Sequence, residues 1–173
     1  MKLYHVSEEP NIEIFVPRES RMGMPLVWAL CERTLPNFLT PRDCPRVTYH
    51  AHESSTEEDI ARFFSATERH CVAIEPDWHK RMLATTLYVY EFDSANFKLG
   101  DESAGYYVSE CSETPVAVMR YDDLYAELFK RNVEVRHVDD LWKLGRKVQQ
   151  STLHWSLCRM GNAKYPQPPL NSE

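Results

Sequence analysis

The chain has 173 residues, of which 43% are hydrophobic and 27% are charged, and this composition is that of a globular domain with its own core rather than of a disordered chain. Its formal net charge of −6 argues against a protein dedicated to nucleic-acid binding. The sequence has no run of about 18 apolar residues, which a membrane span would need, and its five cysteines without a CxxC pair do not suggest a disulfide framework. We therefore expect a cytoplasmic protein whose partner is neither a membrane nor a nucleic acid.

Eight short segments are predicted strands because they are rich in β-branched and aromatic residues, which suit a pleated, half-buried surface. In chain order they are KLYHVSE, LVWALC, RVTYHAH, CVAIEP, TLYVYEFD, GYYVSE, PVAVMRY and VEVRHV. Several connections between them are shorter than the roughly one dozen residues that a βαβ crossover needs. The predicted fold is therefore α+β, with a mixed, mostly antiparallel β core and short flanking helices.

Two helices are predicted in the first half of the chain. The first follows Cys31 and should be short, because Pro36 and Pro41 interrupt it. The second begins near Ser55 and Glu58, which form an S-x-x-E pattern ahead of an apolar run. This pattern predicts a capping box in which Ser55 is the N-cap.

Two further helices have signals at their ends. In YDDLYAELFKRN, Leu124, Leu128 and Phe129 form the predicted apolar face, and Asn132 is the predicted C-cap. The run DDLWKLGRKVQQS predicts the last helix, although Gly145 costs it about 1 kcal/mol relative to Ala.

No repeat or linker divides the sequence. We expect a single α+β domain over residues 1–164. Residues 165–173 are expected to form a flexible Pro-containing tail, since PQPPL can extend neither a helix nor a central strand.

His5 is the first candidate for a functional side chain. In a strand, Leu3, His5 and Ser7 share one face, and the turn-prone Glu-Glu-Pro-Asn that follows places His5 near a strand end. The alternative is a core histidine that bonds to a backbone carbonyl.

Arginine use suggests an anion-binding loop. Between Leu3 and His79 there are seven arginines and no lysine, and the planar guanidinium suits carboxylate and phosphate groups. In the segment P-R-D-C-P-R, two prolines stiffen a loop that carries Arg42, Asp43 and Arg46. The alternative is an internal Arg–Asp pair that holds the loop and needs no ligand.

A metal site and a reactive thiol are the other possibilities that we weighed. The alternation in RVTYHAH puts His50 and His52 on one face, but a third ligand would be needed and a solvated strand face is the commoner outcome, so we predict no metal. Among the cysteines, Cys44 lies near two arginines, which could stabilise its thiolate.

Nearly the whole chain, from Leu3 to about Met160, resembles a small bacterial family of uncharacterised proteins. The resemblance rests on the runs LYHVSEEPNIEIFVPR, PLVWALCERTLPNFLTPRDCPRVTYHA and GYYVSECSETPVAVMRYDDL. This resemblance implies no activity.

A weaker resemblance is to the ADP-ribosyltransferase-like fold, a split antiparallel β core that binds NAD in a cleft. Residues 3–7 match its first strand except that Val6 replaces Gly, and Val-Trp-Ala at residues 27–29 matches a second strand with Trp28 in place of Tyr. The resemblance implies that His5 and Ser7 contact a ribose and that Trp28 stacks on a base.

The same resemblance identifies catalytic candidates and weakens the case for the usual reaction. In G-Y-Y-V-S, Tyr106 occupies the position of the catalytic Glu, and a phenol cannot supply the carboxylate that stabilises an oxocarbenium-like charge. Glu110 could serve only in a shifted register. The candidates are therefore His5, Tyr106 and Glu110, with NAD as the cofactor that the resemblance implies.

Two functions follow. In the first, the protein binds or processes NAD or a phosphorylated nucleotide, with phosphates held by Arg18, Arg42 and Arg46. In the second, it is a non-catalytic binding or interaction protein whose Arg-rich loop holds an anionic ligand or partner. A carboxylate that converges with His5 on one cleft would favour the enzyme.

Overall fold

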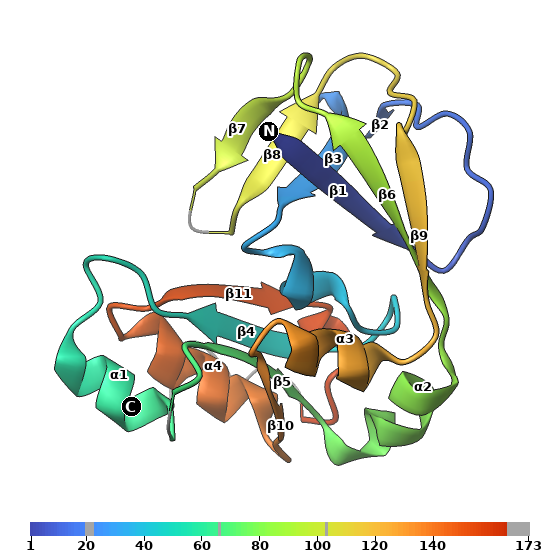
Figure 1. The fold of residues 1–173 in the computed structure, drawn as a ribbon. Helices are drawn as coiled ribbons and strands as arrows, with labels where there is room; N and C mark the ends of the chain where they lie inside the picture. Colours follow the sequence, from blue (N-terminus) through green and yellow to red (C-terminus); the bar gives the residue numbers. More distant parts are fainter. Residues whose placement is uncertain (20–22, 66, 103, 166–173) are drawn as a thin grey trace. The chain divides into compact units, whose positions relative to one another are not determined.

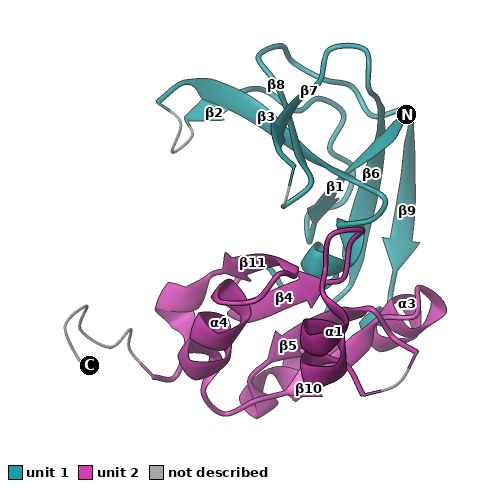
Figure 2. Cartoon of the chain, turned by 90° about the vertical axis from the view of Figure 1, so that its left-hand side faces the viewer, with its two compact units in different colours: residues 1–42, 85–124 teal, residues 43–84, 125–173 magenta. Residues whose placement is uncertain are grey.

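The computed structural model describes residues 1–19, 23–65, 67–102 and 104–165, so Arg21 and most of the predicted tail lie outside the described residues. The fold is α+β with mostly antiparallel strands, as predicted. The chain forms two compact units, and each of them is discontinuous in sequence (Figure 2). Unit 1 contains residues 1–42 and 85–124, and unit 2 contains residues 43–84 and 125–173. That residues 1–164 form one domain stays a prediction.

Unit 1 is built on an antiparallel sheet with the strand order β7-β8-β3-β1-β6-β9 (Figure 1). Its strands are β1 (Lys2–Ser7), β3 (Pro25–Cys31), β6 (Leu87–Asp93), β7 (Lys98–Asp101), β8 (Tyr106–Ser109) and β9 (Ala117–Tyr121). A two-residue strand, β2 (Arg18–Glu19), pairs with the start of β3. The 3₁₀ helix η1 (Leu35–Phe38) follows β3 and is the short helix predicted after Cys31.

One face of the unit 1 sheet carries its apolar core. Because directly paired residues of antiparallel strands share a face, the pairs Leu3–Phe92 and His5–Tyr90 place His5 on the core face. The cluster on this face consists of Leu3, Phe15, Val27, Ala29, Tyr90, Phe92 and Phe97.

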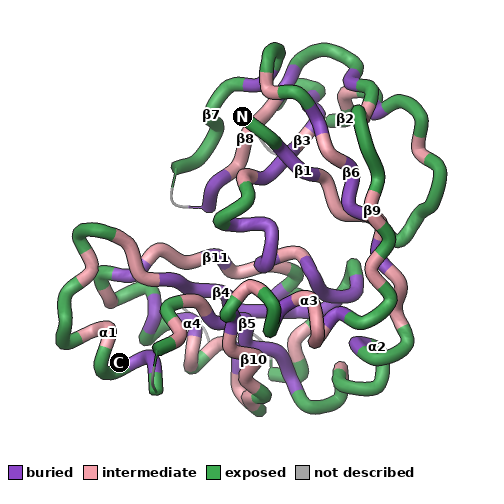
Figure 3. Tube along the Cα trace, viewed as in Figure 1, coloured by how far each residue is buried: buried purple, intermediate pink, exposed green. Residues whose placement is uncertain are grey.

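Unit 2 is built on a four-stranded sheet with the order β10-β5-β4-β11. Its strands are β4 (Arg46–His50), β5 (His70–Ile74), β10 (Glu134–His137) and β11 (His154–Cys158). The β10–β5 pair is parallel and the other two pairs are antiparallel. Figure 3 shows that β4 is buried along its length, whereas the edge strand β7 of unit 1 is exposed.

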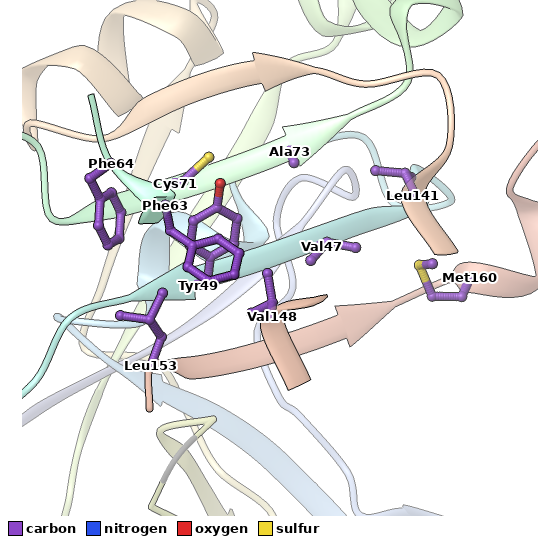
Figure 4. Packing of buried hydrophobic residues seen from close by; sticks show 10 residues of the cluster. All are labelled: Val47, Tyr49, Phe63, Phe64, Cys71, Ala73, Leu141, Val148, Leu153 and Met160. Atoms are coloured by element: carbon purple, nitrogen blue, oxygen red, sulfur yellow. The ribbon is translucent and has the colours of Figure 1, made fainter. Parts of the chain in front are cut away.

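The helices are short. They are α1 (Glu57–Phe63), α2 (His79–Ala84), α3 (Leu124–Lys130) and α4 (Leu141–Gln149), with the 3₁₀ helices η2 (Pro76–Trp78) and η3 (Met160–Asn162). In the core of unit 2, α1 and α4 contribute apolar side chains to one face of the sheet. Figure 4 shows the rings of Tyr49, Phe63 and Phe64 gathered at one end of this core.

The N-cap of α1 is Thr56, so the predicted capping box at Ser55 is wrong by one residue. Thr56 has extended backbone dihedrals, and its hydroxyl accepts a hydrogen bond from the Asp59 amide at 3.3 Å. The Ser55 hydroxyl instead accepts from the His52 amide at 3.0 Å and belongs to the preceding turn. Four Ser, Thr and Glu residues stand together at residues 54–57, and sequence spacing alone did not select the correct cap.

Helix α3 ends as predicted, with Asn132 in the left-handed region at φ 56°. Its predicted apolar face is wrong in one member, because Phe129 is 62% exposed while Leu124 and Leu128 are buried. Residues 124 and 128 lie above one another on a helix, whereas residue 129 is turned about 100° further round the axis.

The presence of Gly145 inside α4 is explained by packing, which the sequence alone did not show. A Cβ at this position would lie 2.9 Å from Leu157 Cδ2 of β11. The glycine therefore permits close packing of α4 on the sheet, which offsets its weak helix propensity.

All five cysteines are free thiols. Within the described part of the chain, no helix combines the length and the apolar character that crossing a bilayer requires.

Candidate functional site

His5 lies on β1 between an aromatic ring and a backbone carbonyl. Its Nδ1 is 2.8 Å from the Trp28 carbonyl oxygen, and its ring centroid is 4.8 Å from that of Phe15. Because a carbonyl oxygen only accepts, Nδ1 must carry the proton, and in the neutral ring the Nε2 lone pair is then available as an acceptor. The carbonyl bond that we considered for a core histidine is present, but it uses only one of the two ring nitrogens.

The environment of His5 favours the neutral imidazole. Burial lowers the pKa of His5, and the positive charges of Arg18 and Arg42 lower it further, against the opposing effect of the hydrogen bond to Trp28. At neutral pH, therefore, His5 is a hydrogen-bond acceptor beside two cations.

The turn after β1 connects His5 to Arg42. The Ser7 hydroxyl accepts a hydrogen bond from the Glu9 amide at 3.0 Å, and a Glu8 carboxylate oxygen accepts one from the Arg42 amide at 2.8 Å. Glu8 thus holds the Arg42 backbone near the end of β1. Ser7 lies on the same strand face as His5, but its hydroxyl is used within the turn.

Arg18 and Arg42 are both exposed, and both belong to unit 1. Neither guanidinium makes a hydrogen bond or an ion pair with any residue that the structure describes. Their charges nevertheless act on His5. We call these three residues the His5–Arg18–Arg42 cluster: one neutral acceptor and two guanidiniums whose donors are available.

The Trp28 side chain lies on the other face of the sheet. The β1–β3 register pairs Tyr4 with Leu30. His5 therefore shares its face with Ala29, and the Trp28 indole points away from it. Only the backbone of Trp28 reaches His5, so the geometry does not place the indole for stacking on a ligand beside His5.

The two other catalytic candidates do not join His5 either. Tyr106 pairs with Leu30 and thus lies on the face opposite His5, where its ring makes an edge contact with Trp28 at 5.5 Å between centroids. Glu110 is exposed, and its carboxylate lies 4.0 Å from Lys98 Nζ.

Sequence reasoning missed one buried carboxylate of unit 1. Glu113 is only 7% exposed, and its carboxylate accepts a hydrogen bond from Ser109 at 2.5 Å. Its backbone pairs with that of Phe15, whose ring packs on His5. In S-E-C-S-E-T-P no period or spacing distinguishes Glu113 from Glu110, so the sequence held no signal for it.

The Pro41–Arg46 loop does not present its two arginines alike. Arg42 is exposed, whereas Arg46 is buried and donates to the Cys44 carbonyl at 3.0 Å. The Asp43 side chain is exposed, and its carbonyl accepts from the Asn162 amide group at 2.8 Å. The boundary between the units falls between Arg42 and Asp43. Arg46 therefore bonds to the backbone of its own loop, through the Cys44 carbonyl rather than through the Arg–Asp pair that the alternative predicted.

Cys44 is a buried thiol, and the stabilised thiolate that we weighed for it is not supported. Burial raises the pKa of Cys44 to about 12, and the nearby positive charge of Arg46 offsets only part of this effect. The side chain is therefore a neutral thiol at physiological pH.

Histidines of unit 2 form a row across its sheet. The registers pair His50 with both His70 and His154, and the His52 ring stacks on that of His154 at 3.6 Å between centroids. His50 is buried in a strand that is buried throughout, so the expectation of a solvated strand face is wrong. Among the described residues, no group of three or more His, Cys, Asp or Glu side chains is arranged to hold a metal ion.

The comparisons with known proteins establish a family but no activity. The sequence model of a family of unknown function, DUF6886, matches residues 4–163, so the chain belongs to this family. No curated protein and no solved structure matches the chain. The resemblance to the ADP-ribosyltransferase-like fold therefore stays a prediction.

Proposed function

We propose that this member of a family of unknown function binds a phosphorylated small molecule with a free hydroxyl group, of the NAD or nucleotide class, at the His5–Arg18–Arg42 cluster. The observation that carries the proposal is the hydrogen bond of His5 Nδ1 to the Trp28 carbonyl at 2.8 Å, which leaves Nε2 as an acceptor. It is joined by the exposed guanidiniums of Arg18 and Arg42, whose positive charges act on this histidine. Arginine presents a planar set of donors that matches phosphate oxygens.

The neutral imidazole supplies the second half of the recognition. Since Nδ1 donates to Trp28, Nε2 can accept a hydrogen bond from a ligand hydroxyl, such as that of a ribose. Glu8 assists indirectly, because its bond to the Arg42 amide fixes the segment from which that side chain extends.

The charge around His5 favours binding over transferase chemistry. The charges that act on His5 are both cationic, which suits an anionic ligand, and neither of the other catalytic candidates, Tyr106 and Glu110, joins His5. This observation favours the second candidate function, a non-catalytic binding protein, over the enzyme.

Calorimetric titration of the full chain with NAD, ADP-ribose, AMP and inorganic phosphate tests the proposal. We expect at least one nucleotide to bind, with inorganic phosphate as a weaker competitor. Arg42→Ala should weaken binding about ten- to a hundredfold, since a charge-assisted hydrogen bond contributes roughly 1.5–3 kcal/mol. Arg42→Lys should restore part of the affinity, because a point charge replaces a bidentate donor.

Arg146→Ala is the matched control, since Arg146 is an exposed arginine of α4 in unit 2 and its loss changes the net charge equally. Absence of binding by the native protein would refute the proposal. Equal weakening in Arg42→Ala and Arg146→Ala would reduce it to a nonspecific charge effect.

A further inference from the structure

We propose that unit 2 holds a binding site for a divalent transition-metal ion, formed by His79, Tyr125 and His137. Three separate elements bring these side chains together. His79 is the first residue of α2, Tyr125 lies in the first turn of α3, and His137 is the last residue of β10. The inference is independent of the function proposed for unit 1.

Two imidazole nitrogens meet at one phenol oxygen in this cluster. Tyr125 Oη is 2.8 Å from His79 Nδ1 and 3.2 Å from His137 Nε2. The two imidazole centroids are 5.6 Å apart. The hydrogen bonds lie at the protein surface, so an ion and its water ligands can reach the three atoms from solvent.

These separations match those between the ligands of one metal ion. Ligand bonds of about 2.0–2.1 Å imply neighbouring donor atoms about 2.9 Å apart in an octahedron and about 3.3 Å apart in a tetrahedron. Two imidazoles on one tetrahedral ion would have their centroids about 5 Å apart. The cluster thus needs only small side-chain movements to hold an ion.

The donor set selects the class of ion. Two imidazoles suit Zn²⁺, Ni²⁺ and Cu²⁺, whereas Mg²⁺ and Ca²⁺ prefer oxygen ligands. The ion would take the lone pairs of both facing nitrogens. Whichever imidazole now carries a proton toward Tyr125 would move it to its other ring nitrogen, so no net proton release from the imidazoles is needed. Tyr125 would be the third ligand as a phenolate, with its proton released to solvent, and water would complete the shell.

The stacked pair His52 and His154 offers a contrast within the same unit. Both nitrogens of His52 are engaged, Nε2 by the Thr152 carbonyl at 2.9 Å and Nδ1 by the Ser54 hydroxyl at 3.2 Å. An ion at His52 would have to break bonds to two groups on different segments, whereas at His79 and His137 it would replace only the bonds to Tyr125, whose oxygen would itself become a ligand.

Titration of the metal-free full chain with Zn²⁺, followed by calorimetry and by ¹⁵N NMR of the imidazole nitrogens, tests the site. We expect one strong site, with the largest shifts at His79 Nδ1 and His137 Nε2. His79→Gln and His137→Gln should each weaken Zn²⁺ binding about tenfold or more, and Tyr125→Phe should weaken it less. His52→Gln is the control and should leave the affinity unchanged.

Three results would overturn the site: no binding by the native protein at micromolar Zn²⁺, unchanged affinity in the His79→Gln/His137→Gln double variant, or shifts confined to His52 and His154. Melting curves establish that each variant is folded. If His137→Gln does not fold, His79→Gln decides, because His79 is exposed at the start of a short helix.

Discussion

The two units use histidine in opposite ways. Unit 1 contains only His5, and unit 2 contains the other six of the seven histidines. His5 packs on the Phe15 ring, and burial together with the positive charges of Arg18 and Arg42 lowers its pKa, so it is neutral at neutral pH. In unit 2, imidazoles lie against one another or against a phenol. The two proposals, an anionic ligand in unit 1 and a metal ion in unit 2, rest on this difference between the neighbours of the same side chain.

The largest expected effect tests whether the two units bind independently. The Arg18→Ala/Arg42→Ala variant should lose about two orders of magnitude or more in nucleotide affinity, because it removes both guanidiniums that we propose to bind phosphate. Its Zn²⁺ affinity should not change. Calorimetry measures the nucleotide affinity and the Zn²⁺ affinity of this variant and of His79→Gln/His137→Gln, which gives four dissociation constants. If either variant lowers the affinity for both the nucleotide and Zn²⁺, the proposed division of roles between the units is wrong.

The next effect compares one glycine from each unit. Gly105 of unit 1 has φ 65°, and a Cβ there would collide with the Thr34 side chain, including its Cβ. Gly105→Ala should cost about 2–3 kcal/mol, from backbone strain and overpacking together.

Gly145→Ala in unit 2 is the matched substitution. The one close approach of its Cβ would be to Leu157 Cδ2, the end of a flexible side chain, at 2.9 Å. Alanine also gains about 1 kcal/mol of helix propensity, so the net change in stability should be within about 1 kcal/mol. Urea unfolding of both variants gives the difference. An equal cost would show that backbone strain at Gly105 contributes little.

A smaller change in stability tests which residue is the N-cap of α1. Thr56→Ala should destabilise the protein by about 1 kcal/mol, because the Asp59 amide loses its side-chain acceptor. Ser65→Ala, at an exposed position after the end of α1, is the control. A larger loss in Ser55→Ala than in Thr56→Ala would restore the capping box that the sequence predicted.

The smallest effect is a pH dependence that arises from His5. Its pKa is lower in the folded protein than in the unfolded chain, so between these two values the unfolded state binds more protons. Stability attributable to His5 should therefore be complete above about pH 6.5 and should fall as the pH drops below that value. Chemical unfolding at pH 7.5 and 5.5 measures this loss. His5→Gln should remove it, and a loss that persists in this variant would come from the histidines of unit 2.

Most of the fold could be predicted from the sequence, and the exceptions have physical reasons. All eight predicted strands are present, because each is a run of β-branched or aromatic residues. β2, β7 and β11 were missed. β2 has two residues and the residues of β7 are all exposed. β11 (HWSLC) alternates polar and apolar residues but contains no β-branched residue, so it lacks the composition by which the other strands were found.

The candidate site was only partly predictable. His5, Arg18 and Arg42 were singled out from local patterns, and the electrostatic field at His5 includes both arginines. The face to which Trp28 points depends on the register between β1 and β3, and local sequence does not determine this register. His79, Tyr125 and His137 come together only through contacts between residues distant in sequence, so no local motif marks them.

The interleaved path of the chain has a consequence for its biosynthesis. The chain passes between the units after residues 42, 84 and 124, so each unit joins two separate stretches of sequence. The strand β1 pairs along its length with β6, which is synthesised some 85 residues after it. The strand β4 pairs with β11, which is synthesised more than 100 residues after β4. Pairings of such long sequence separation form slowly. Neither unit can close while the chain is still short, so a nascent chain halted near residue 84 would hold two incomplete sheets rather than one finished unit.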